Sequence, residues 1–474
     1  MNWMPAFPEL VLAICGLIIL VVGAFLKKTE SFVPVSALTI AALVGTAFLV
    51  CGSADGVGLG HLFINDNFAR FLKLLILTGG ILATVVAMGY VREGGDLPFE
   101  TPVLMLFSTL GAMLMASSGN LITLFVGLEL SSLSIYILCA IERERLKAAE
   151  AGLKYFILGS LASGLLLYGI SLVYGYAGTM EYPALTSILM ASGLLPVGLV
   201  IGIVFIIVGL AFKLSAVPFH MWTPDVYQGA PTPVTAFMAG APKFAAFALL
   251  IRIMAGPFGM LAPRWQLLLV VISALSMLFG SLAAIPQTDI KRLMAYSSIG
   301  HMGYAMMGLA SASGAGIRGT LVYLSAYLVM NAGVFAGIAA MRRQGHEVTK
   351  IRDLAGLGQT NPAMALTMTV FMFSMIGVPP MAGFFGKFMV FAAAWNAGLT
   401  GLLIVGGVSA LIGAYYYLRV VKVMYFDAPE GSFDRPAPSL TFVSASMGVA
   451  TVLYVVGLGV ITSAADAAAS ALIG

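Results

Sequence analysis

Residues 195–218 read Leu195-Pro-Val-Gly-Leu-Val-Ile-Gly-Ile-Val-Phe-Ile-Ile-Val-Gly-Leu-Ala-Phe-Lys213-Leu-Ser-Ala-Val-Pro218. This run is long enough to cross the hydrocarbon core of a bilayer as a helix, yet it contains a lysine. A charged side chain at the centre of a membrane helix costs about 2.5–3.5 kcal/mol on insertion scales, and such residues face a protein interior or a water-filled path. The stretch therefore predicts a membrane-spanning helix that takes part in moving charge.

The composition of the whole chain points to the same class of protein. Of 474 residues, 60% are hydrophobic and only 9% are charged, whereas roughly a quarter of the residues in soluble domains are charged. The apolar blocks leave no room for a soluble domain, so the net charge of +4 reflects loop charges and not a nucleic-acid partner. Cys15, Cys51 and Cys139 lie in separate apolar segments, and their spacing predicts neither a disulfide nor a metal site.

The apolar blocks predict an all-α integral membrane protein, a single polytopic domain of residues 1–474 with about fourteen transmembrane helices. The expected spans are residues 8–26, 34–52, 69–91, 102–118, 120–141, 152–177, 196–217, 232–255, 266–285, 293–311, 317–341, 363–394, 400–425 and 439–462. We expect three N-terminal helices in residues 1–95 and a C-terminal helix at 439–462. Between them we expect two five-helix repeats, at residues 102–255 and 266–427.

The basic residues predict an orientation. If the N-terminus lies outside, only Arg70, Arg264 and Arg318 fall in outside loops, while most of the other basic residues fall in inside loops. This asymmetry follows the positive-inside rule. Because Lys27 and Lys28 follow the first apolar segment and none precede it, we interpret that segment as an uncleaved helix. Both termini are then expected on the periplasmic side of a bacterial inner membrane.

Prolines predict that two spans are broken. Pro218 cannot donate a hydrogen bond to the carbonyl of Leu214, so the seventh span is expected to break about one turn after Lys213. The twelfth span contains Pro379 and Pro380, and Lys387 follows them. Each broken span is the fourth of its five-span block, and because five is odd the two repeats are expected to be inverted. Broken helices at matching positions are typical of a transport site, although a single proline kink is also common in membrane helices.

Four charged residues lie within long apolar runs: Glu129, Lys213, Lys243 and Lys387. Glu129 and Lys213 are partners by sign, although Glu129 could instead form a structural ion pair or be a protonated acid. Lys243 lies at mid-span with no carboxylate nearby in sequence. A lysine without such a partner can lose and regain its proton, as a relay requires.

The remaining titratable residues divide into auxiliary candidates and anchors. Lys154 could serve a relay or extend to the membrane surface. His220 and His301 could carry protons or be hydrogen-bonded core residues. Lys291 is interpreted as an auxiliary or interfacial residue, and Lys73 and Arg252 as anchors at helix ends. The chain has no cysteine cluster, haem pair of histidines or glycine-rich nucleotide motif, so we expect no redox centre, metal or bound cofactor in it.

Two long motifs carry a resemblance to a known family. They are Phe212-Lys-Leu-Ser-Ala-Val-Pro-Phe-His-Met-Trp-Thr-Pro-Asp-Val-Tyr-Gln-Gly-Ala-Pro-Thr-Pro-Val-Thr-Ala-Phe237 and Gln287-Thr-Asp-Ile-Lys-Arg-Leu-Met-Ala-Tyr-Ser-Ser-Ile-Gly-His-Met-Gly-Tyr304. Both resemble shared motifs of the antiporter-like subunits of bacterial NADH:quinone oxidoreductase, respiratory complex I. The sequence of residues 225–233 and the lysines at positions 243 and 387 are similar to those of the subunit N branch of that family.

The resemblance implies a proton-translocating subunit of the complex's membrane arm, a translocase driven by quinone reduction elsewhere. It implies that Glu129 and Lys213 are a coupled pair, that Lys243 is the central relay, and that Lys387 is the terminal relay. Lys154, His220, Lys291 and His301 would be auxiliary. The implied partners are other membrane-arm subunits, including a neighbouring antiporter-like subunit and small membrane subunits, together with lipid. The complex would use FMN, iron–sulfur clusters and a quinone.

Two alternatives stay open at the level of sequence. A multi-subunit cation/proton antiporter sharing the fold would show sodium-dependent transport without NADH. A structural, non-pumping membrane subunit would use its buried charges only to lock helix packing.

Overall fold

The apolar blocks form helices because a chain inside a bilayer must satisfy its backbone polar groups internally. The computed structural model describes residues 2–27, 31–191, 196–429 and 431–473, so Lys28 lies outside the described residues. Among these residues, ten helices are long and apolar enough to cross a membrane. Five further apolar helices are only 10–17 residues long. Of the fourteen expected spans, several therefore correspond to shorter or divided helices.

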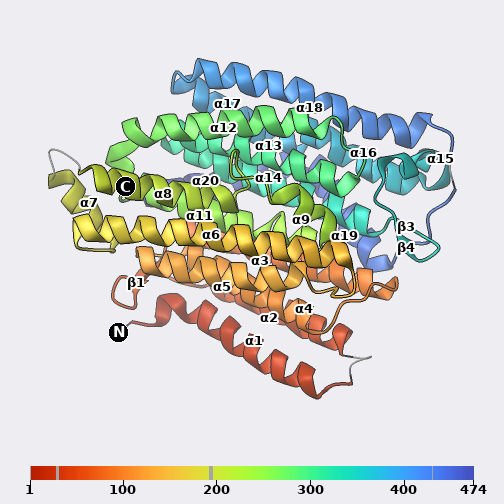
Figure 1. The fold of residues 1–474 in the computed structure, drawn as a ribbon, viewed down its shortest axis with the longest axis horizontal. Helices are drawn as coiled ribbons and strands as arrows, with labels where there is room; N and C mark the ends of the chain where they lie inside the picture. The colour runs from red at the N-terminus through yellow and green to blue at the C-terminus, as the bar shows by residue number, and fades with distance from the viewer. Residues whose placement is uncertain (1, 28–30, 192–195, 430, 474) are drawn as a thin grey trace.

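The helices follow one another along the chain with short connections (Figure 1). The N-terminal helices are α1 (Phe7–Phe25), α2 (Phe32–Cys51) and α3 (Asn67–Arg92). Next come α4 (Glu100–Ala116), α5 (Leu121–Cys139), α6 (Leu146–Ala177), α7 (Tyr182–Ala191), α8 (Val197–Lys213), α9 (Thr223–Gly229), α10 (Thr232–Met238) and α11 (Ala241–Ala255). The rest are α12 (Ala262–Ala284), α13 (Ile290–Ala310), α14 (Gly314–Ala339), α15 (Leu357–Thr360), α16 (Pro362–Ile376), α17 (Ala382–Asn396), α18 (Thr400–Phe426), α19 (Pro438–Val452) and α20 (Tyr454–Ile473).

The connections add two small antiparallel hairpins to the expected all-α fold. Strand β1 (Gly56–Gly58) pairs with β2 (Phe63–Asn65), and Val57 lies opposite Ile64. Strand β3 (Arg342–Arg343) pairs with β4 (His346–Glu347). Three short 3-10 segments, η1 (Met4–Ala6), η2 (Gly259–Leu261) and η3 (Ile351–Leu354), complete the elements.

Two helix breaks were not predicted from the sequence. The expected span 232–255 is divided at Ala239–Gly240 into α10 and α11, and Pro242 lies in the first turn of α11, where its missing N–H is tolerated. The expected span 439–462 is divided as well: α19 ends at Val452, and α20 begins at Tyr454 and continues to Ile473. The short helix α7 also lies outside every expected span.

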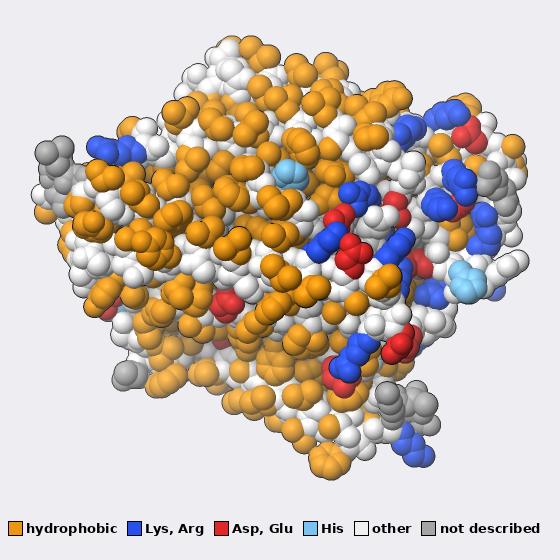
Figure 2. All heavy atoms as spheres, viewed as in Figure 1, with side chains coloured by type: hydrophobic (Ala, Val, Ile, Leu, Met, Phe, Trp, Pro, Cys, Tyr) orange, Lys and Arg blue, Asp and Glu red, His pale blue; other side chains and the backbone are white. Residues whose placement is uncertain are grey.

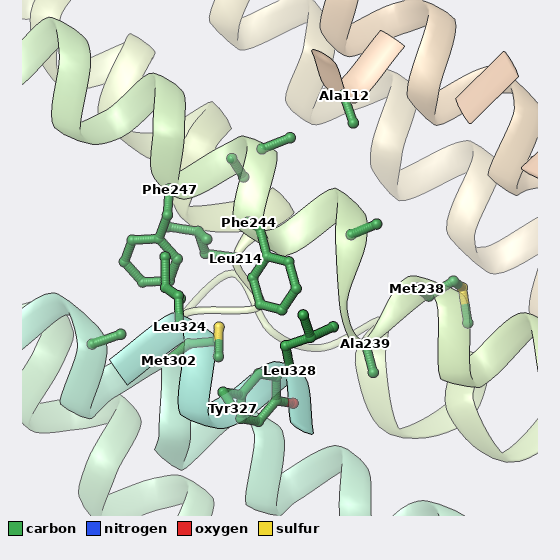
Figure 3. Packing of buried hydrophobic residues seen from close by; sticks show 14 of the residues in the cluster. Ala112, Leu214, Met238, Ala239, Phe244, Phe247, Met302, Leu324, Tyr327 and Leu328 are labelled. Atoms are coloured by element: carbon green, nitrogen blue, oxygen red, sulfur yellow. The ribbon is translucent and has the colours of Figure 1, made fainter. Parts of the chain in front are cut away.

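Small residues allow the helices to approach closely. A Cβ added to Gly111 of α4 would lie 2.5 Å from the backbone nitrogen of Ser131 in α5, so the two backbones touch there. Such contacts between glycines are typical of helix packing in membranes, where dispersion contacts replace the hydrophobic effect as the source of association. Figure 3 shows the resulting apolar packing in the centre, where Phe244 of α11, Met302 of α13 and Leu328 of α14 meet around the side chain of Tyr327.

The centre of the protein is formed by α10–α11 and α14. In each of these two spans, 94% of the most apolar stretch is buried inside the protein, against 17% for α20. The outward surface is largely apolar, and charged side chains gather toward one end of the face in Figure 2. In Figure 1 both termini lie at the opposite end. A continuous apolar belt with charge at its edge is the surface expected of a protein surrounded by lipid.

Candidate functional site

Lys213 lies at the point where α8 ends. Its Nζ donates hydrogen bonds to the hydroxyls of Ser132 (2.8 Å) and Tyr136 (2.9 Å), both on α5. A cavity of about 20 Å³ adjoins these groups, with Trp222 in its wall. A cavity of this size has room for about one water molecule. The lysine is therefore held by neutral hydroxyl groups beside a small cavity whose wall is mostly apolar.

Glu129 lies on the same face of α5, one turn before Ser132. Its side chain is only partly buried, and its Oε1 atom has no hydrogen-bond partner among the described residues. The ion pairs formed by the described residues within 4.0 Å do not include Glu129 with Lys213. The structure thus brings the two residues to neighbouring positions, with hydroxyl groups contacting the lysine in place of the carboxylate.

The first helix break begins at Lys213, five residues earlier than Pro218 itself. Pro218 lies in the irregular segment between α8 and α9. Two side chains satisfy backbone groups freed by this break: Trp222 Nε1 donates to the Phe212 carbonyl at 3.1 Å, and Ser276 Oγ accepts from the Val217 N–H at 2.9 Å. Irregular backbone is stable at membrane depth only when it is buried and satisfied in this way.

Lys243 lies in the first turn of α11, and its side chain is 1% exposed. Its Nζ donates to the Ser298 hydroxyl at 2.7 Å and lies 5.3 Å from the centre of the Tyr227 ring. Ser298 is in turn hydrogen-bonded to the Tyr327 hydroxyl at 2.6 Å. No carboxylate of the described residues lies within ion-pair distance of this lysine. Lys243 is therefore a buried amine with neutral polar partners.

His301 lies one turn further along α13 than Ser298. Its Nδ1 is 2.6 Å from the Tyr323 hydroxyl, and its Nε2 is 3.1 Å from the Tyr417 hydroxyl. Tyr417 also shares a short hydrogen bond with Ser297. The histidine is thus a fully hydrogen-bonded core residue at a position where it also connects α13, α14 and α18.

Lys387, the last of the three buried lysines proposed from the sequence, lies on α17. Its Nζ donates to the carbonyls of Met375 (2.9 Å) and Ile376 (2.8 Å), the last residues of α16. It lies 4.8 Å from the centre of the Tyr304 ring and borders a cavity of about 10 Å³ that His301 also lines. Pro379 and Pro380 lie in the segment between α16 and α17. Lys213 and Lys387 therefore both lie at a helix break, each beside a small cavity.

The auxiliary residues have different surroundings. Lys154 is partly exposed and pairs with Glu150 and Asp225, both at 2.7 Å. His220 is only partly buried, and the centre of its ring lies 4.5 Å from the centre of the Phe279 ring, with the two ring planes tilted by 60°. Of the two alternatives for Lys154, its exposure and ion pairs favour the surface position, and no hydrogen bond of the described residues joins His220 to Lys213, Lys243 or Lys387.

Lys291 was interpreted as an interfacial residue, but its side chain is fully buried. Its Nζ donates to the Ala230 carbonyl at 2.6 Å and lies 4.0 Å from Glu347. Burial, the largest single influence, pushes the pKa of Glu347 upward, but Lys291, the Thr232 hydroxyl, Arg145 and Arg342 together outweigh it. The pKa of Glu347 therefore lies below its ordinary value, and the carboxylate is charged at neutral pH.

The anchors predicted at Lys73 and Arg252 are also wrong. Lys73 is fully buried and forms an ion pair with Glu9 at 2.6 Å, and Arg252 pairs with Asp66 at 2.9 Å. Sequence reasoning missed these carboxylates because each lies in a different segment from its partner. It also missed the hydroxyl groups that contact Lys213 and Lys243, because a few Ser and Tyr residues within apolar helices give no distinctive pattern. The described residues contain no group of three His, Cys, Asp or Glu side chains that could hold a metal.

Comparisons with known proteins agree on one family. Residues 118–413 match the family model described as "NADH:quinone oxidoreductase/Mrp antiporter, TM". The chain is 65% identical over 473 residues, covering 100% of both chains, to a protein of Gluconacetobacter diazotrophicus named NADH-quinone oxidoreductase subunit N. It is 55% identical, again over 100% of both chains, to the protein of that name from Granulibacter bethesdensis.

Solved structures give the same result. A chain of respiratory complex I from Thermus thermophilus with bound aureothin is 32% identical and superposes with a TM-score of 0.83, covering 97% of this chain and 99% of that one. A chain of the Mrp complex from Dietzia sp. DQ12-45-1b shares the fold, with a TM-score of 0.85 at 22% identity over 100% of both chains.

Proposed function

This chain belongs to the subunit N family of NADH-quinone oxidoreductase, the antiporter-like membrane-arm subunits of complex I, and from that premise we propose that it moves protons through a relay of Glu129, Lys213, Lys243 and Lys387. Its partners are the other membrane-arm subunits of the complex. In the proposed mechanism the chain is a translocase and carries out no redox step. FMN, iron–sulfur clusters and quinone belong to other subunits. Quinone reduction there changes the charge of groups in the neighbouring subunit, and this change acts electrostatically on the titratable residues of this chain.

The observation that carries the proposal is the environment of Lys243. A lysine that is fully buried and bonded to a serine hydroxyl has no negative charge to hold its proton. Burial without a paired charge favours the neutral amine, so the proton can leave and return. Ser298 also contacts the Tyr327 hydroxyl, and the ring centre of Tyr327 lies 5.4 Å from that of His301, which lines the same cavity as Lys387.

The switch in this mechanism is the distance between Glu129 and Lys213. When the carboxylate approaches, it stabilises the ammonium form of Lys213; when it withdraws toward a neighbouring subunit, the proton is released toward Lys243. The hydroxyls of Ser132 and Tyr136 hold the lysine in the released state. Lys154, His220, Lys291 and His301 are assigned auxiliary roles, and His301 has the best-connected position of the four.

We further propose that the chain has fourteen spans and that residues 102–255 and 266–427 are inverted repeats. The support is the matching position of the two broken helices, each with a lysine and a small cavity at the break. Alternating access would open these cavities to opposite sides of the membrane, and the breaks at Pro218 and at Pro379–Pro380 are the natural gates.

The test is the replacement of Lys243 by Arg and by Ala. Arginine keeps the positive charge but does not release its proton at physiological pH. We expect both variants to assemble and both to lose proton transport by about 100-fold or more, the usual cost of removing a proton-transfer group. The measurement is proton uptake per NADH oxidised by the purified complex in vesicles, with assembly followed on native gels. Normal pumping by Lys243→Arg would show that the residue is structural and would overturn the relay.

A further inference from the structure

A polar cavity lies at the inner end of the helices, away from the line of lysines. It forms where α3 and α14 end and where the linker between α18 and α19 crosses them. Its volume is about 200 Å³, and its lining residues are Arg92, Glu93, Ala340, Arg342, Asp434 and Arg435. Ligand pockets for drug-sized molecules usually have about 300–1,000 Å³. This cavity therefore fits a small polar group and not a nucleotide.

The wall of the cavity is fixed by Arg342. Its side chain is 5% exposed, and its Nη1 donates to the carbonyls of Glu93 (2.5 Å) and Gly345 (3.2 Å). Its guanidinium also lies 4.7 Å from the centre of the Tyr90 ring. The positive charge of Arg342 is therefore held rigidly in place.

Both carboxylates in the lining already have partners. Asp434 accepts hydrogen bonds from the N–H groups of Gln344 (3.1 Å) and Gly345 (2.8 Å). Glu93 accepts from the Ala437 N–H and lies 3.6 Å from Arg342 Nε. Burial, the largest influence, raises the pKa of Glu93 above its ordinary value despite these contacts. Neither carboxylate forms an ion pair with Arg92 or Arg435 among the described residues, and the three arginines of the lining outnumber its two carboxylates.

Two positive charges are free for a ligand. Arg92 and Arg435 are both exposed, and neither forms an ion pair or side-chain hydrogen bond with any of the described residues. They come from distant parts of the chain, the end of α3 and the linker before α19, and meet at one cavity. An arginine pair with its fork-shaped donors is well suited to phosphate oxygens.

The surface next to this cavity is apolar. Val86, Ala336, Ala339 and Leu440 form a buried cluster of α3, α14 and α19, and Leu82 and Val85 pack against it while remaining partly exposed. Arg92 is the last residue of a membrane-spanning helix, so the cavity lies at the level of lipid headgroups. Basic pockets between membrane helices on the inner side are typical sites for anionic lipid headgroups.

We propose that this cavity binds the phosphate headgroup of an anionic phospholipid of the inner leaflet, with Arg92 and Arg435 as its ligands and an acyl chain along Leu82 and Val85. The charge chemistry would also suit free phosphate, but the apolar surface beside the cavity favours a lipid. This site takes no part in the relay, so its test is independent of Lys243.

The experiment compares the purified complex with its Arg92→Gln/Arg435→Gln double variant. Each is stripped of lipid, incubated with vesicles of phosphatidylcholine containing increasing cardiolipin, and the retained cardiolipin is measured by mass spectrometry. We expect the affinity of one site to fall roughly 30-fold in the double variant, at about 1 kcal/mol for each arginine near the membrane surface. Arg352→Gln is the matched control, because this arginine is 73% exposed in an inner loop and lies outside the cavity; it should retain the site.

Two further measurements distinguish loss of the site from misfolding and from binding of free phosphate. Arg92→Lys/Arg435→Lys keeps both charges, and we expect it to assemble and retain most of the binding even if the glutamine variant fails to fold. Inorganic phosphate at millimolar concentration should leave cardiolipin bound. Displacement of cardiolipin by phosphate would show a free-phosphate site and overturn the lipid assignment. The site would also be overturned if the wild-type complex and the glutamine variant retained equal cardiolipin. An equal loss of cardiolipin in the Arg352→Gln control would overturn it as well.

Discussion

The buried lysines of this chain differ in the partners that hold them. Lys213 and Lys243 contact hydroxyl groups, and Lys387 contacts two backbone carbonyls. Lys73 instead contacts the carboxylate of Glu9, and both side chains are almost completely buried. A neutral partner stabilises the ammonium ion only moderately, whereas a carboxylate fixes its charge. The partners therefore separate the proposed relay lysines from a structural one.

The first prediction concerns the pair of Lys73 with Glu9. Replacing Lys73 by Met leaves Glu9 buried without its partner, and breaking a buried ion pair costs about 3–5 kcal/mol. We expect Lys73→Met to lower the thermal stability of the purified complex. The double variant Lys73→Met/Glu9→Leu should recover most of this loss, because no charge then remains buried. A double variant as unstable as the single one would contradict the structural role of the pair.

At the scale of elements, the second break depends on a close contact between α16 and α17. The Gly383 N–H donates to the Ser374 hydroxyl at 3.0 Å, and a Cβ added to Gly383 would overlap the Ser374 carbonyl oxygen. This contact fixes the position of α17 and hence brings Lys387 to the carbonyls of Met375 and Ile376. Only glycine fits at this position.

The second prediction follows from that contact. Gly383→Ala must push α17 away from α16, and overpacking of this kind costs about 1–3 kcal/mol. We expect assembly with reduced proton transport, because Lys387 is displaced from its carbonyl partners. Gly407→Ala is the matched control, since no atom lies within 4 Å of the added Cβ on α18. If both variants transported protons equally well, the geometry of the break would not matter for function.

At the scale of the whole molecule, charge is distributed unevenly along the membrane normal. Charged side chains gather at one end of the face in Figure 2, while both termini lie at the other end in Figure 1. The hairpin of β3 and β4 and the segment to Asp353 belong to the charged end, and they pack against Lys291 and Arg145 through Glu347. By the positive-inside rule we expect this end to face the cytoplasm.

The third prediction tests that orientation. In a background with the exposed Cys51 changed to Ser, we place a single cysteine at Lys350 or at Met260, which are exposed at opposite ends. In right-side-out vesicles, a membrane-impermeant maleimide should label Met260→Cys and leave Lys350→Cys unlabelled until the membrane is permeabilised. The reverse pattern would require the opposite topology.

The sequence by itself determined the class of the protein, most of its spans and the two broken helices near Lys213 and Lys387. These features depend on local properties: the length of apolar runs, the distribution of basic loops and the missing N–H of proline. The same local logic missed the breaks at Gly240 and Leu453: Gly240 and Pro242 lie within an apolar run long enough to be one span, and the run around Leu453 has no proline.

Only the tertiary structure decided which partner each buried charge has. Ser132 lies 81 residues from Lys213, Ser298 lies 55 residues from Lys243, and Glu9 reaches Lys73 from another helix. The packing of the helices also buries Lys291 and Lys73, which by position along their helices resemble surface anchors. The same packing leaves Glu129 beyond ion-pair distance of Lys213. The physical reason is that desolvation and hydrogen bonding depend on which helix faces pack together, and packing brings together residues far apart in the chain.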